Sequence, residues 1–354
     1  MENRVHEDEL LLIRGLRSLF RGVGQVMFQN NGWCGLCLLI GIGWGAWMEG
    51  RPQVAWGALL GLVVSTLTGY LLRLPSEDGR QGLWGFNGVL VGCALMTFLR
   101  PTPWAWALLI LGSAMTVWLR EGMNRVLAPV RVNSLTMPFV LTTWIVLLAA
   151  RAMQGIPTEG LPLPGFPPAV HPYLHTDLSD LVGYWLRGIS QVFLLDNRLT
   201  GLCFLVGLAL SNGWSALWAG FASALSLAFA LLWGASGEAI SEGLYGFSPV
   251  LTGIALGSIF YHPSWRSALW CLVGVVVTLL MQAALNTLLA PIGLPSFTAP
   301  FCLATWIFLL PMLDLEPREQ HQSAFLPKTD HTDWHPDRKP HLKGRSEGGS
   351  EWIR

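Results

Sequence analysis

The sequence is poor in charge. Only 12% of its 354 residues are Asp, Glu, Lys or Arg, whereas a soluble globular domain carries about 25%. This scarcity excludes a water-soluble protein of this size, because too few charged side chains exist to cover its outer faces. With 52% hydrophobic residues and a mean hydropathy of +0.46, the composition indicates a protein that lies in the lipid bilayer.

Alternating ten-residue segments, the signature of a membrane β-barrel, are also missing. Many apolar runs instead reach the roughly 20 residues that a membrane-spanning helix needs. No carboxylate or histidine falls at the centre of these runs. Because ion-coupled carriers usually keep such a group inside the membrane, its absence favours a neutral cargo.

Features of a metal site, an enzyme or a secreted protein are scarce. Cys34-x-x-Cys37 could be a redox or metal pair, but no second pair accompanies it, and packing is the simpler interpretation. The tail histidines are irregularly spaced, so we predict no metal and no cofactor; they are His321, His331, His335 and His341. No nucleophile–base constellation predicts an enzyme, and residues 1–23 lack the apolar core of a signal peptide.

What the sequence does have is an internal repeat, with a separation of about 161–166 residues. Residues 82–92 (GLWGFNGVLVG) match residues 243–253 (GLYGFSPVLTG) at seven of eleven positions. Residues 127–144 (LAPVRVNSLTMPFVLTTW) match residues 289–306 (LAPIGLPSFTAPFCLATW) at ten of eighteen positions. Gln25-Val26 and Gln191-Val192 begin a third matching block, so the two halves are expected to share one fold.

Each half contains five apolar spans after a short segment that cannot cross the membrane, residues 16–29 or 182–195. The spans are expected at about 32–48, 53–73, 84–99, 103–119, 136–153, 199–215, 217–234, 245–261, 265–283 and 298–314. Because five is odd, the second half enters from the opposite side. We predict an all-α polytopic membrane protein: two inverted five-helix repeats (ten transmembrane helices) plus two re-entrant half-helices around a central pore.

The same spans predict the organisation and the orientation of the chain. Residues 1–153 form the first repeat, 154–181 a Pro-rich extracytoplasmic linker, 182–315 the second repeat and 316–354 a polar cytoplasmic tail. With both termini in the cytoplasm of an inner (plasma) membrane, 17 of the 22 basic residues lie inside. This distribution obeys the positive-inside rule.

The third block supplies two hydroxyls as candidate site groups. Pro138 and Pro300 suit the first turn of a helix, because proline lacks an N–H. Thr136 and Thr298 then fall at the N-cap positions. They are either simple helix caps or, across the pseudo-two-fold axis, two hydroxyls near the middle of one pore.

The other two blocks supply an apolar slot and a set of acceptors. Phe86 with Leu90, and Phe247 with Leu251, share one helix face each, either for packing or as a slot for flat molecules. The half-helices end with carbonyl groups that lack helical partners and could accept N–H groups of a cargo. Those carbonyls belong to Gln25, Val26, Phe28, Gln191, Val192 and Leu194. The alternative is a half-helix that only anchors the fold.

These paired motifs resemble the urea transporter family over residues 15–312, and we expect a bacterial member. The resemblance implies a homotrimer with one pore per protomer and passive, channel-type passage of urea and small urea analogues. It also implies a filter in which a Phe and Leu slot, two oxygen ladders and two threonines line the pore, at the twelve positions named above. Gln191 departs from members that carry Glu there, which removes a charge from the filter.

Two other classes of function stay open at this point. An ion-coupled secondary transporter also uses inverted repeats, but it is disfavoured by the missing carboxylate inside the membrane. A channel for water, glycerol, ammonia or short amides would fit the neutral interior. The sequence lacks an Asn-Pro-Ala pair and a mid-membrane His pair, and nothing in it predicts a nucleic-acid partner.

Overall fold

A computed structural model describes residues 15–167 and 169–313, and it confirms the prediction of an all-helical chain. A helix over residues 15–25 comes first. The first half continues with α2 (Gly32–Met48), α3 (Gln53–Leu71), α4 (Ser76–Arg80), α5 (Phe86–Phe98), α6 (Pro103–Leu127), η1 (Ala128–Val130) and α7 (Met137–Ala152). The second half has α8 (Leu178–Ser190), η2 (Gln191–Phe193), α9 (Arg198–Ser211), α10 (Gly213–Leu232), α11 (Gly237–Ser241), α12 (Phe247–Ile254), η3 (Ala255–Ile259), α13 (Trp265–Leu289), η4 (Ala290–Ile292) and α14 (Ala299–Leu309).

Each predicted span overlaps a helix, although several ends differ: α13 runs on to Leu289, α9 ends at Ser211 and α14 at Leu309. The span expected at 103–119 continues to Leu127, because Arg120 is buried in ion pairs with Asp78 and Glu121 rather than ending the helix in water. The span expected at 245–261 changes after Ile254 into a π-helix, a widened turn that is often found at functional sites. The predicted polar tail and its histidines lie outside the described residues.

Three of the described helices are long and apolar enough to cross a membrane: Pro52–Leu71, Gly213–Leu232 and Trp265–Ile292. The segments Leu178–Phe193 and Arg198–Ser211 form a pair bent by 73°, the geometry of a broken span or a re-entrant loop. Five further apolar helices are shorter, with 10–17 residues. The fold is therefore that of a helical membrane protein, and the count of ten spans stays a prediction.

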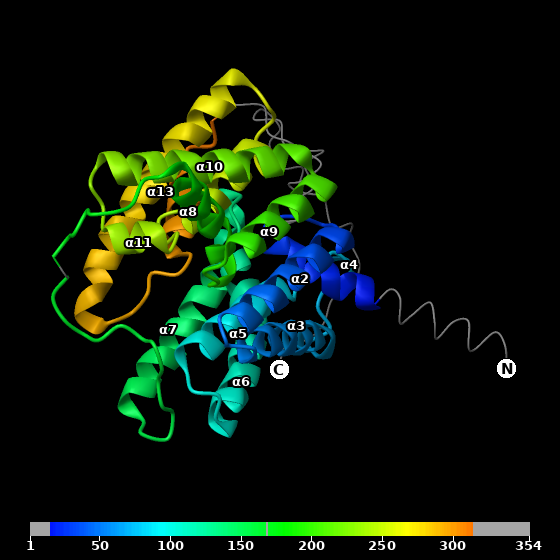
Figure 1. Ribbon diagram of the computed structural model, residues 1–354. Helices are drawn as coiled ribbons and strands as arrows, with labels where there is room; N and C mark the ends of the chain where they lie inside the picture. Colours follow the sequence, from blue (N-terminus) through cyan, green and yellow to red (C-terminus); the bar gives the residue numbers. More distant parts are fainter. Residues whose placement is uncertain (1–14, 168, 314–354) are drawn as a thin grey trace, which may run out of the picture.

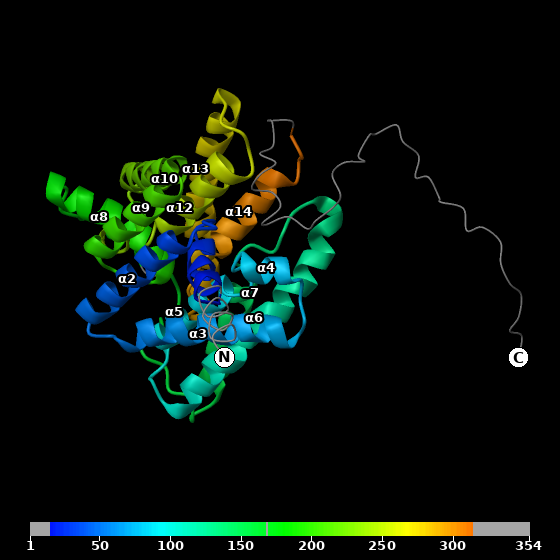
Figure 2. The same ribbon diagram turned by 90° about the vertical axis from the view of Figure 1, so that its right-hand side faces the viewer.

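The helices of the two sequence halves occupy different parts of the molecule. In Figures 1 and 2, α2–α7 gather in the lower part and α8–α14 in the upper part. Within the first half α3 packs against α5 and α6, and within the second half α10 packs against α12 and α13. The halves meet where α2 packs against α9 and where α7 contacts α14.

Glycine makes the contact between α3 and α5 unusually close. A Cβ added to Gly61 would lie 2.1 Å from the carbonyl oxygen of Gly88, and one added to Gly92 would lie 2.0 Å from that of Gly57. Glycines four residues apart thus let the two helix backbones touch, as small residues do in membrane helix pairs. This contact fixes the position of α5, which carries the first Phe and Leu pair.

Bulky residues adopt the left-handed conformation at matching positions of the two halves. Phe28 has a φ of 63° and Leu194 a φ of 60°, each at the turn before α2 or α9. Leu135 has a φ of 50° and Phe297 a φ of 47°, each just before α7 or α14. Such a conformation is costly for a large side chain, so the surrounding structure must hold it in place. All four turns lie at the predicted site.

Candidate functional site

The two threonines of the duplicated motif meet in the interior. The hydroxyl oxygens of Thr136 and Thr298 lie 2.7 Å apart at the starts of α7 and α14, and the side chains are 3% and 2% exposed. Neither side chain makes a capping hydrogen bond to its helix, so the simple-cap interpretation is wrong. The Thr136 hydroxyl also lies 3.3 Å from the sulfur of Cys302. Both hydroxyls are thus directed across the junction of the two halves.

A reciprocal pair of tryptophans holds these helix starts together. The Trp144 indole N–H donates to the carbonyl oxygen of Pro295 (2.9 Å), and the Trp306 indole N–H donates to that of Asn133 (2.8 Å). Each tryptophan follows the threonine of its own motif by eight residues and bonds to the chain just before the other motif. These two hydrogen bonds fix the register of α7 against α14, and this register places the two threonine hydroxyls in contact.

The two glutamines of the half-helices are held in the same orientation. Gln25 Nε2 donates to the carbonyl oxygen of Gln81, and Gln191 Nε2 donates to that of Glu242, both at 2.8 Å. With one N–H engaged, each amide still has its oxygen and its second N–H to offer. Gln25 Oε1 is buried and has no hydrogen-bond partner among the described residues. Gln191 can therefore still accept a hydrogen bond, although it has no charge.

The backbone acceptors need one correction. The carbonyl oxygens of Gln25 and Gln191 do have partners, because the N–H groups of Phe28 and Leu194 donate to them at 3.1 and 3.0 Å. These bonds form because each helix ends in a tight turn rather than stopping open. Since a carbonyl oxygen has two lone pairs, each can accept one further hydrogen bond. The two carbonyls are thus weaker candidates than unpartnered ones.

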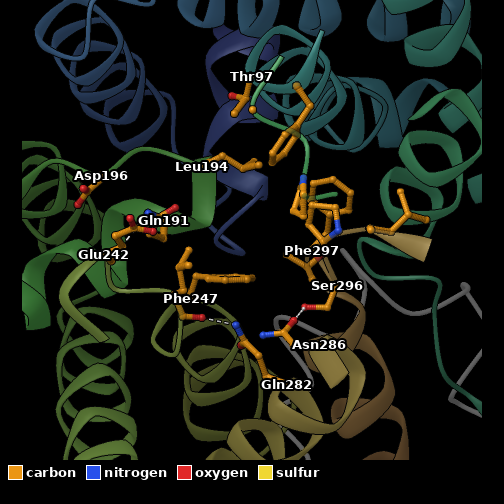
Figure 3. A pocket seen from close by; sticks show the side chains of 18 of the residues that line it. Thr97, Gln191, Leu194, Asp196, Glu242, Phe247, Gln282, Asn286, Ser296 and Phe297 are labelled. Atoms are coloured by element: carbon orange, nitrogen blue, oxygen red, sulfur yellow. Dashed lines mark hydrogen bonds between the residues drawn. The ribbon is translucent and has the colours of Figure 1, made fainter. Parts of the chain in front are cut away.

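A cavity of about 940 Å³ opens beside this junction. It brings together five of the twelve predicted site residues: Gln191, Val192, Leu194, Phe247 and Thr298. Figure 3 shows Gln191 on one side of it, with Phe297 opposite. Within the described residues the cavity lining does not include the other seven predicted site residues, Gln25, Val26, Phe28, Phe86, Leu90, Thr136 and Leu251. All five lining predictions come from the second half.

Aromatic rings fill the corresponding space in the first half. The Phe28 ring packs edge-on against Phe301 and Phe260, with centroids 5.9 and 6.1 Å apart. At the matching position of the second half, the smaller Leu194 lines the cavity. Phe86, Leu90 and Leu251 are buried nearby in the same hydrophobic core. The cavity therefore reaches Thr298, whereas Phe28, Phe86 and Leu90 are buried side chains outside its lining.

Sequence reasoning missed several residues that line the cavity. Phe297 and Ser296 lie inside the duplicated motif, so the motif itself was a signal. Gln282 and Asn286 stand out as two amides four residues apart in an apolar helix. Pro162 and Phe166 also line the cavity, although the linker that carries them was expected only to connect the halves. No local pattern in the linker predicts this.

The linker is tied to the fold on both sides of the cavity. Thr158 forms an isolated β-bridge with Leu99, and the Gly165 N–H donates to the carbonyl oxygen of Ala290 at 3.2 Å. Arg151 donates to the carbonyl oxygen of Gly293 at 2.7 Å and to that of Pro162. These bonds make the linker part of the cavity wall.

Charged groups at the cavity are largely paired with one another. Asp196 accepts an ion pair from Arg187 at 2.9 Å, and its backbone N–H donates to Glu49, which also pairs with Arg51. Burial raises the pKa of the Asp196 carboxyl, against the opposing effect of nearby arginines. Burial, and then the charges of Asp196 and Glu238, raise the pKa of Glu242. In residues 15–167 and 169–313, no group of three His, Cys, Asp or Glu side chains could hold a metal ion.

Apolar helices, a bent helix pair and a cavity that reaches Thr298, whose hydroxyl bonds to that of Thr136, are features of a multi-pass membrane transport protein. Residues 16–312 match the urea transporter family. Urea transporter 1 of the sheep Ovis aries is 32% identical over 299 residues, which cover 82% of this chain and 76% of that protein. Urea transporter 1 of the mouse Mus musculus is 30% identical over 311 residues, covering 86% and 79%. The chain belongs to the urea transporter family, and it is a transport protein rather than an enzyme.

Proposed function

We propose that the chain is a channel-type transporter through which urea permeates passively. The observation that carries this function is the Thr136–Thr298 pair at the inner end of the cavity, in a chain of this family. Urea is flat and neutral and has four N–H donors and one carbonyl acceptor. A wall of apolar side chains with hydroxyl and amide oxygens matches that chemistry.

The filter is proposed at the twelve positions named from sequence. Phe86, Leu90, Phe247 and Leu251 form the slot, and Thr136 and Thr298 form its middle. Gln25 and Gln191, with the backbone of Val26, Phe28, Val192 and Leu194, provide the acceptors on either side. The matched orientation of the two glutamine amides supports this assignment.

The proposed setting is a pore built from two inverted repeats, residues 1–153 and 182–315, with the linker 154–181 outside and the tail 316–354 inside. Equal left-handed turns at matched positions and the reciprocal tryptophan bonds support a two-fold relation between the halves. Ten spans, both termini in the cytoplasm and a homotrimer complete the proposal. A bacterial origin stays a prediction, since the relatives compared above are mammalian.

Urea flux into proteoliposomes tests the function. We expect saturable entry of labelled urea that is driven by its own gradient and inhibited by dimethylurea. Flux that requires Na⁺ or a pH gradient would instead indicate an ion-coupled transporter. Flux of water, ammonia or a short amide without urea would indicate a channel for another solute.

A further inference from the structure

One corner of the cavity is polar and is not used by the proposed filter. Gln282 and Asn286 are four residues apart on α13, so they share one helix face, and both line the cavity together with Ser296. Figure 3 shows the two amides next to each other, across the cavity from Gln191 and Leu194. The corner is therefore a separate part of the wall.

The Gln282 amide has an unsatisfied oxygen. Its Nε2 donates to the carbonyl oxygen of Leu244, which fixes the direction of the amide. The side chain is 1% exposed, and its Oε1 has no hydrogen-bond partner among the described residues. A buried acceptor without a partner is costly, and because Gln282 lines the cavity, a ligand bound there could supply the missing donor.

Asn286 supplies the complementary group. Its Oδ1 accepts from the Ser296 hydroxyl at 2.7 Å, so the amide NH₂ is the group it has left to offer a ligand. Gln282 thus presents an acceptor and Asn286 a donor on one face. That combination matches a neutral carboxamide or urea group, which has both N–H donors and a carbonyl oxygen.

The first half does not contain this amide pair. Arg120 stands at the position that matches Gln282, and its charge is neutralised by Asp78 and Glu121. Asn124 stands where the second half has Asn286, and its Oδ1 accepts from the Ser134 backbone N–H at 2.8 Å. The acceptor–donor pair is thus specific to the cavity end of the molecule.

We propose that Gln282 and Asn286 form an additional binding subsite for a neutral amide group, where the cargo is held before it enters the filter. Binding of an amide at this subsite does not depend on the proposed function; only its role as a waiting position for urea does. Of the three carboxylates at the cavity, Glu49 and Asp196 are paired with Arg51 and Arg187, and burial raises the pKa of Glu242, so a cation is not the favoured ligand. Acetamide, the smallest stable carboxamide with a methyl reporter, is the probe of choice.

The first test uses Gln282→Met, which keeps the size of the side chain and removes both the acceptor and the hydrogen bond to Leu244. In proteoliposomes, the urea concentration at half-maximal flux and the acetamide concentration that halves flux should both rise about fivefold, the worth of one net hydrogen bond. Flux at saturating urea should be retained. Asn286→Asp keeps the bond from Ser296 and removes the donor. It should therefore raise the acetamide concentration that halves flux by a similar factor.

Ser113→Ala is the matched control. The Ser113 hydroxyl is also buried without a hydrogen-bond partner among the described residues, but it does not line the cavity. Its removal should leave both concentrations unchanged. If Gln282→Met fails to fold, Asn286→Asp carries the test.

A second readout separates this proposal from the proposed function. Saturation-transfer NMR of the acetamide methyl group on the purified protein reports binding without any flux. A loss of signal in both variants supports the subsite even if the wild type does not pass urea. Unchanged acetamide signal and unchanged half-maximal concentrations in both variants would overturn it and leave Gln282 Oε1 bound to water only.

Discussion

At the residue scale, the central feature is a pair of hydroxyls that would be read as helix caps in either half alone. Thr136 and Thr298 occupy cap positions, yet each hydroxyl faces the other rather than its own helix. The backbone N–H groups at the start of α7 already have partners, since Met137 donates to the carbonyl oxygen of Ser134 and Phe139 to Asn87 Oδ1, so the hydroxyls are not needed as caps. Two polar helix starts meeting in an apolar interior are costly unless they bind something polar, which is what a passing urea would supply.

Replacing both threonines by valine tests that role. Because the two hydroxyls bond to each other, removing both should change stability by less than about 1 kcal/mol, whereas the single Thr298→Val leaves Thr136 with Cys302 as its remaining side-chain partner. We expect urea flux of the double variant to fall at least about tenfold, the effect of roughly 1.4 kcal/mol on the barrier. Stopped-flow urea flux and thermal melting measure the two effects.

Thr142→Val is the control for the threonine pair. Thr142 is fully buried on the same helix, and its hydroxyl has no partner among the described residues. Its flux should match the wild type. Normal flux in the double variant as well would show that the threonines only hold the two helices together.

Glu242 offers a pH-dependent test at the same scale. Its pKa is raised by burial, so the folded state holds a proton that the unfolded state has already lost. Stability therefore falls as pH rises from the ordinary Glu pKa, about 4.3, through the raised folded value. Glu242→Gln should raise the melting temperature by about 1–2 °C at pH 8 and by nothing at pH 4.

The first half shows which hydrogen bond a glutamine at position 242 could form. Gln81 stands at the position that matches Glu242, and its Nε2 donates to Glu77 at 2.8 Å. Glu238 stands where the first half has Glu77, so the new amide has a similar partner. A melting curve at pH 8 that is lower for Glu242→Gln than for the wild type would contradict the raised pKa.

At the scale of elements, apolar runs and the repeat were enough to predict the helices but not their irregular parts. Spans such as 32–48 coincide with α2, because length and apolar content alone determine a membrane helix. The π-turn after Ile254 and the extension of α6 past Arg120 depend on tertiary contacts that leave no local pattern. The same holds for the linker, whose bonds to Leu99 and Ala290 join distant segments.

The candidate site divides in a similar way. The motif threonines were placed correctly as neighbours because the repeat itself implies a two-fold axis. Gln282 and Asn286 could not be predicted from the repeat, because the first half has Arg120 at the position of Gln282. The repeat thus predicts residues that both halves have, such as the two threonines. The cavity lining also depends on residues that only one half has, such as Gln282.

The close glycine contact between α3 and α5 can be tested by its effect on stability. Gly92→Ala would place a Cβ 2.0 Å from the carbonyl oxygen of Gly57, so the helices must separate. We expect a loss of about 1–3 kcal/mol, as for other overpacked interiors. Gly43→Ala on α2 is the matched control, since nothing lies within 4 Å of its added Cβ. A melting temperature equal for both variants would contradict the close contact.

At the scale of the whole molecule, the two ends of the path differ. The cavity reaches Thr298 from the end that carries the linker, and outside this cavity the Phe28 ring packs against Phe301 and Phe260. Leu194, the counterpart of Phe28, is smaller and lines the cavity. In the proposed pore, we therefore expect the narrowest part on the Phe28 side of the threonine pair.

Exchanging the two side chains tests whether Phe28 sets the rate. Both residues have nearly the same left-handed φ, 63° and 60°, so the exchange asks for no new backbone conformation. Phe28→Leu should raise urea flux by about tenfold or less and admit methylurea, because a barrier lowered by up to 1.4 kcal/mol changes the rate tenfold. Leu194→Phe should lower flux, because it adds a second constriction and fills part of the cavity. If instead Phe28→Leu leaves both urea and methylurea flux unchanged while Leu194→Phe blocks them, the rate is set on the cavity side, and the aromatic cluster opens during each passage.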